Sequence, residues 1–170
     1  MKESQMVGAE AIRLRGQIRM MVCVFIVGLV LSGLTAFPLL HELNLLVRLL
    51  GVDGTGPHGE LANWVLRVRD ALATTYRDYP FLGYGTDWLA FGHLVIALFF
   101  IGVWRDPVRN VFILHAGLIA CAGVIPLAMI CGAIRGIPFY WRLMDCSFGI
   151  FGAIPLWWTL RLTRRLAAVQ

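Results

Sequence analysis

Four apolar runs of membrane-spanning length divide this chain of 170 residues, and they constrain its fold more than any other feature. A helix needs about 20 predominantly apolar residues, within a range of about 17–25, to cross the hydrocarbon core of a bilayer. The sequence therefore predicts an all-α fold, an integral membrane four-helix bundle that forms a single membrane domain over residues 1–170. Its spans are expected at about 20–40, 88–104, 111–134 and 143–160.

The composition agrees with a membrane protein. Hydrophobic residues make up 59% of the chain and charged residues only 15%, whereas soluble domains average about 25% charged residues. The formal net charge of +5 could suggest nucleic-acid binding, but no basic surface with interleaved aromatic residues occurs outside the apolar runs. Basic residues beside membrane spans instead meet anionic lipid. We therefore expect membrane lipids, and no nucleic acid, among the partners.

The distribution of basic residues predicts the orientation of the spans. Short cytoplasmic loops carry the excess of Lys and Arg. With both termini inside, the cytoplasmic side holds nine of the 15 basic residues, namely Lys2, Arg13, Arg15, Arg19, Arg105, Arg109, Arg161, Arg164 and Arg165. We therefore predict a protein of the bacterial inner membrane, the cytoplasmic membrane, with its N and C termini in the cytoplasm.

The long loop over residues 41–87 is extracytoplasmic in this topology and contains one predicted helix. The segment Val52–Gly59 is dense in Gly and Pro, which predicts a turn. An amphipathic helix of about four turns is expected from Glu60 to just before Pro80. It can either cover an outward-facing mouth as a lid or lie flat on the bilayer surface. The apolar residues that repeat at intervals of three and four are Leu61, Trp64, Val65, Val68 and Leu72.

Only three residues inside the apolar runs can carry a charge at ordinary pH, and they are His93, His115 and Asp145. Ionisable groups at membrane depth are costly and usually face a partner or a cavity. His93 follows Asp87 by six residues and so lies about 9 Å deeper, whereas His115 lies near the cytoplasmic end of its span. The topology predicts six candidate ligand-binding residues at the extracytoplasmic ends of the spans: His41, Asp87, His93, Arg135, Arg142 and Asp145.

Three interpretations of this cluster are open. In the first it is structural: Asp87 caps its helix, Asp145 pairs with a neighbouring arginine, and His93 bonds a backbone carbonyl or a hydroxyl. In the second it lines a pocket for a small amphiphile, a lipid or a quinone head group, with His93 and an acid handling protons. In the third, His41 and His93 bind a metal or a haem, since bis-histidine haem needs two imidazoles aimed at one iron.

Small residues recur at helical spacing and predict close packing between helices. Small side chains let membrane helices approach one another, which drives their association in lipid. Three prolines, Pro38, Pro126 and Pro155, are expected to kink or end their helices. The small-residue faces are Gly28, Ser32 and Ala36 in the first span, Ala116, Ala120 and Gly123 in the third, and Gly149 with Ala153 in the fourth.

No catalytic signature occurs in the sequence. It has no Walker loop and no GxSxG, and its histidines and cysteines show no HxxH, ExxH or CxxC spacing for a metal. With the small-residue faces, this favours a non-catalytic accessory or structural subunit that packs in a larger membrane complex or associates with itself. The alternative is a membrane protein that binds a small amphiphile, a lipid, a quinone or a haem at the cluster around His93.

Three segments, Tyr84–Trp104, Arg105–Asn110 and Arg135–Asp145, resemble parts of small four-span bacterial membrane proteins of unassigned function. This resemblance implies no mechanism. The layout is also similar to that of the emopamil-binding and sigma-2 receptor group, which has four spans and an acid-lined pocket for sterol-like ligands. That similarity is one of layout alone, and no functional residue is carried over from it.

Overall fold

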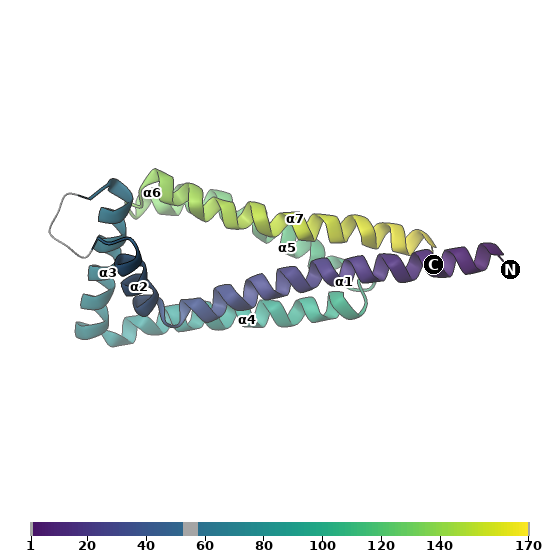
Figure 1. Ribbon diagram of the computed structural model, residues 1–170, viewed down its shortest axis with the longest axis horizontal. Helices are drawn as coiled ribbons and strands as arrows, with labels where there is room; N and C mark the ends of the chain where they lie inside the picture. The colour runs from purple at the N-terminus through teal and green to yellow at the C-terminus, as the bar shows by residue number, and fades with distance from the viewer. Residues whose placement is uncertain (1, 53–57, 170) are drawn as a thin grey trace. The chain divides into compact units, whose positions relative to one another are not determined.

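The computed structural model describes residues 2–52 and 58–169, and in this part of the chain it is helical with no strand (Figure 1). Residues 53–57, most of the predicted turn, lie outside the described residues. Four helices are long and apolar enough to cross a membrane. The all-α prediction and the expectation of four such helices are therefore confirmed. The candidate spans are Gln5–Ala36, Pro80–Arg105, Val111–Ile134 and Phe139–Val169.

The first long helix, α1 (Lys2–Ala36), begins well before the first apolar run and ends before its last residues. Its buried side chains Leu14, Ile18 and Val22 are spaced by four and so lie on one face. The remainder of the run, from Leu39, belongs to a separate helix, α2 (Leu39–Leu49), with Pro38 as its N-cap residue. Proline is tolerated at a helix start because its missing N–H has no partner to lose there. The break expected at this proline is therefore present.

The predicted amphipathic helix is α3 (Glu60–Asp78), and it packs against α2. Its Val65 is buried, as are Leu43 and Val47 on α2. A single 3₁₀ turn, η1 (Pro80–Gly83), then leads into α4 (Tyr84–Arg105).

A hairpin held by one side chain joins α4 to α5 (Val111–Pro126). The Asn110 amide donates from Nδ2 to the carbonyl oxygens of Gly102, at 3.1 Å, and of Asp106, at 2.8 Å. The carboxylate of Asp106 accepts the backbone N–H of Arg109 at 3.1 Å. The two carbonyls also accept backbone N–H groups, Gly102 from Asp106 and Asp106 from Asn110, so the side-chain bonds reinforce the turn between the helices.

The segment after α5 is irregular and begins at a proline. Pro126 lacks the N–H that would continue the helical ladder, and the chain passes into a π-helical turn, η2 (Leu127–Cys131). A short α6 (Gly132–Ile134) and a turn follow, and the last helix is α7 (Phe139–Val169). This helix continues through Pro155 and extends nine residues beyond the apolar run that predicted it.

The chain forms two compact units. Unit 1 comprises Met1–Gly28 and Ala97–Gln170, and unit 2 comprises Leu29–Ile96. Segments of all four long helices belong to unit 1, which is a helix bundle with Phe100 of α4 near its centre. The ring of Phe100 lies 4.6 Å from that of Phe25 on α1, between centroids. A Cβ on Gly117 of α5 would lie 2.9 Å from Phe100 Cζ and 2.8 Å from Leu156 Cδ1 of α7, so the four helices meet here.

Within unit 1, α5 and α7 run side by side (Figure 1) and come closest at Gly149. A Cβ at this position would lie 2.5 Å from the carbonyl oxygen of Cys121 and 3.2 Å from Val124 Cβ. Of the predicted small residues, Gly149 is therefore a true contact between helices. Gly28 and Gly123 instead have no atom within 4 Å of a Cβ and face open space.

We expect Gly149→Ala to destabilise the protein by about 1–3 kcal/mol, because the added carbon must displace the α5 backbone at Cys121. The control is Gly92→Ala in α4, where a Cβ would meet no atom within 4 Å. There, alanine should be neutral or stabilise the helix by up to about 1 kcal/mol. Thermal unfolding of both variants in one mild detergent measures the difference, and an unchanged Tm for Gly149→Ala would contradict this packing.

Candidate functional site

Three of the six predicted site residues, His41, Asp87 and His93, belong to unit 2. His41 is exposed on α2, and Asp87 is exposed in the first turn of α4. A carboxylate there interacts favourably with the free N–H groups of the helix start, as the sequence predicts. His93 lies two turns further along α4 and is partly buried.

The imidazole of His93 is bonded to its own helix. Its Nδ1 lies 2.8 Å from the carbonyl oxygen of Leu89, four residues earlier. Because a carbonyl only accepts, Nδ1 donates, and Nε2 is the acceptor of the neutral ring. Its Cβ also lies at a helix crossing, since a Cβ on Gly33 of α1 would come within 3.1 Å of it. A hydrogen bond from His93 to a backbone carbonyl is what the first of the three interpretations, in which the cluster is structural, predicts.

The other three predicted residues, Arg135, Arg142 and Asp145, belong to unit 1. Arg142 is partly buried and lies across the irregular segment that follows α5. Its NH1 group donates to the carbonyl oxygen of Met129 at 3.3 Å, within η2, and its guanidinium carbon lies 5.3 Å from the centroid of the Phe139 ring. A Cβ on Gly132 would lie 2.7 Å from Arg142 Cδ, so only glycine leaves room for the stem of this arginine.

No ion pair or hydrogen bond joins any two of the six predicted residues in the part of the chain that the structure describes. Asp145 lies in the second turn of α7, three residues after Arg142, but the arginine bonds the backbone of η2 instead. The same residues contain no group of three or more His, Cys, Asp or Glu side chains placed to hold a metal ion. A site shared by the six residues stays a prediction.

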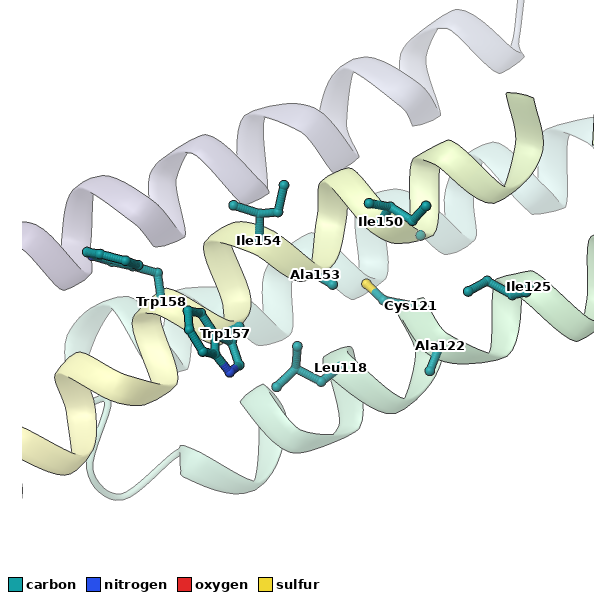
Figure 2. Close-up of a pocket in the computed structure, with 10 residues that line it drawn as sticks. Leu118, Cys121, Ala122, Ile125, Ile150, Ala153, Ile154, Trp157 and Trp158 are labelled. Carbon is teal, nitrogen blue, oxygen red and sulfur yellow. The ribbon is translucent and has the colours of Figure 1, made fainter. Parts of the chain in front are cut away.

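A groove that the sequence analysis did not predict lies between α5 and α7 in unit 1. Figure 2 shows its lining, which is apolar and encloses about 630 Å³. The close contact at Gly149 lies along this groove, and Gly149 is one of its lining residues. The only feature of the sequence that pointed to this region was the pair of small-residue faces in the third and fourth spans. The lining residues are Leu118, Cys121, Ala122 and Ile125 of α5, and Gly149, Ile150, Ala153, Ile154, Trp157 and Trp158 of α7.

An arginine lies just beyond one end of this groove. The guanidinium carbon of Arg161 is 3.9 Å from the centroid of the Trp157 ring, close enough for a cation–π interaction. The groove can therefore hold an apolar chain, and its tryptophan end lies beside a positive charge.

Comparisons of the chain with family models, with curated proteins and with solved structures find no match.

We expect Arg142→Ala to cost about 1–3 kcal/mol of stability, because it removes a charged donor from a partly buried carbonyl and leaves the space over Gly132 empty. Arg142→Met should recover part of this loss, since it keeps the apolar stem. Arg135→Ala is the control, because this side chain is exposed and its loss should change stability by no more than about 0.5 kcal/mol. Chemical or thermal unfolding in detergent separates the three variants, and equal losses at positions 135 and 142 would refute the role of Arg142.

Proposed function

We propose that this protein is a non-catalytic integral membrane subunit that packs against another membrane helix through the outer face of α5. In this proposal the four long helices cross the bacterial inner membrane as a bundle, both termini are cytoplasmic, and α3 lies on the extracytoplasmic surface. The partner is another subunit of a membrane complex or a second copy of this chain.

The exposure of α5 carries this proposal. Only 6% of the most apolar 18-residue window in Val111–Ile134 is buried, against 28% in Phe139–Val169. Large side chains are 78% exposed at Phe112 and 72% exposed at Ile119. A span with so few buried residues leaves much of its surface for lipid or for a partner, although one side of α5 packs against α7.

The shape of this exposed face favours a protein partner. Ala116 and Ala120 are four residues apart, and Gly123 follows on the same side of the helix. All three are exposed, and Phe112 and Ile119 stand beside them. A shallow strip of small residues between large ones lets a second helix bring its backbone close, which is how membrane helices associate. Lipid chains need no such strip.

The test is native mass spectrometry after gentle solubilisation. We expect an assembly heavier than the 19.0 kDa chain. Replacing Ala116 and Ala120 together by leucine should weaken it by about 5-fold to 150-fold in association constant, which corresponds to the about 1–3 kcal/mol cost of overpacking. The matched control is Ala133→Leu, an exposed alanine of the same candidate span that lies outside this face.

A native chain that is purely monomeric and carries no co-purifying protein would overturn the proposal. The proposal would also be overturned if the double leucine variant at Ala116 and Ala120 formed the same assembly as the native chain and the Ala133→Leu control.

A further inference from the structure

The groove between α5 and α7 continues into a group of arginines on the same helix face. Along α7, Ile150, Ile154 and Trp157 line the groove, and Arg161 follows four residues after the tryptophan. Residues three and four apart on a helix share a face. Arg164 and Arg165 therefore extend the same stripe by one more turn, and the groove face changes from wholly apolar to strongly positive within about two turns.

These three arginines are available to an external anion. All three are exposed, and none takes part in an ion pair within the described residues. Arg161 is held over Trp157 by the cation–π contact described above. Arg165 also lines a separate polar depression of about 400 Å³ with Glu10 and Arg13 of α1. Arg161 and Arg164 do not line this depression.

We propose that this groove is a binding site for one anionic phospholipid, with an acyl chain along the apolar lining and the phosphate at Arg161 and Arg164. A guanidinium offers paired N–H donors that match a phosphate, which an ammonium group does not. Trp157 and Trp158 lie between the two parts, at the level where indole rings prefer the boundary of hydrocarbon and headgroups. In the proposed topology these residues face the cytoplasmic leaflet, whose surface is negative.

The combination of surfaces favours a lipid over a protein helix as the occupant. A phospholipid carries an apolar chain and an anion joined end to end, in the order that α7 presents them. A partner helix would need an acidic side chain at the arginines and small residues along the whole groove to fit between α5 and α7.

This site uses a different side of α5 from the proposed subunit contact. Leu118, Ala122 and Ile125 line the groove, whereas Ala116, Ala120 and Gly123 form the outer face. The inference rests on the membrane location proposed above but not on the partner helix. Lipid binding and assembly can therefore fail separately, and native mass spectrometry reads both in one spectrum.

The experiment adds phosphatidylglycerol or phosphatidylcholine with identical acyl chains to the delipidated, detergent-solubilised full chain and measures the bound fraction by native mass spectrometry. We expect phosphatidylglycerol to bind more tightly. The double variant Arg161→Gln with Arg164→Gln should lower its affinity roughly fivefold for each arginine removed. The affinity for phosphatidylcholine should fall less, because the choline cation offsets the charge of the same phosphate. Arg105→Gln, which removes an exposed arginine at the end of α4, should have no effect on either lipid.

Filling the groove tests the position of the acyl chain. Ala153→Phe should lower the bound fraction of both lipids, and Ala122→Phe repeats the test from α5 if the first variant fails to fold by circular dichroism. Equal affinity of the native chain for the two lipids would overturn the proposal, as would lipid binding that survives the groove-filling variants. Loss of the assembly without loss of lipid in Ala153→Phe would overturn it in favour of a protein helix in the groove.

Discussion

The contact between the backbones of α5 and α7 at Gly149 is the constraint on which the rest of unit 1 depends. Between membrane helices the hydrophobic effect gives no net attraction, so association relies on how closely the helices pack. Because position 149 carries no Cβ, the carbonyl of Cys121 can lie where that carbon would be. The same approach brings Gly117 against Leu156 and Phe100. The groove lies along this contact, and Gly149 is among its lining residues.

Three sides of α5 differ in their surroundings: one packs against other helices, one lines the groove, and one is exposed. Gly117 lies against α7 and α4, and Cys121 lies against α7. Leu118, Ala122 and Ile125 line the groove. Ala116, Ala120 and Gly123 are exposed, although small residues at this spacing are typical of a face that packs against another helix. A helix of only 16 residues thus presents one surface that the chain itself covers, and two more exposed surfaces, those of the proposed subunit contact and of the proposed lipid site.

The apolar runs predicted the number of long helices because segment length and hydropathy are local properties. They predicted helix ends less well. The break at Pro38 follows from its missing N–H, but the extension of α7 to Val169 depends on burial of Leu162 and Leu166, which periodicity within the apolar run did not show. The π-helical turn after Pro126 and the groove could not be predicted. The missing N–H of Pro126 predicts a break but not the form in which the chain continues. The groove depends on how two helices rotate against each other, and a single sequence gives the small residues without saying which of them will touch.

Polar side chains inside the candidate spans mostly bond to the backbone of their own chain. His93 donates to Leu89, His115 lies 3.0 Å from the carbonyl of Val111, and Arg142 donates to Met129 in η2. Each polar group finds a carbonyl nearby, which removes much of the cost of placing it in an apolar environment. Asp145 has no such bond in the described part of the chain. Because these side chains already bond to carbonyls of their own chain, the surface that is left for other molecules consists of apolar helix faces and the arginines at their ends. The subunit contact and the lipid site that we propose therefore depend on surface shape and on charge at the helix ends.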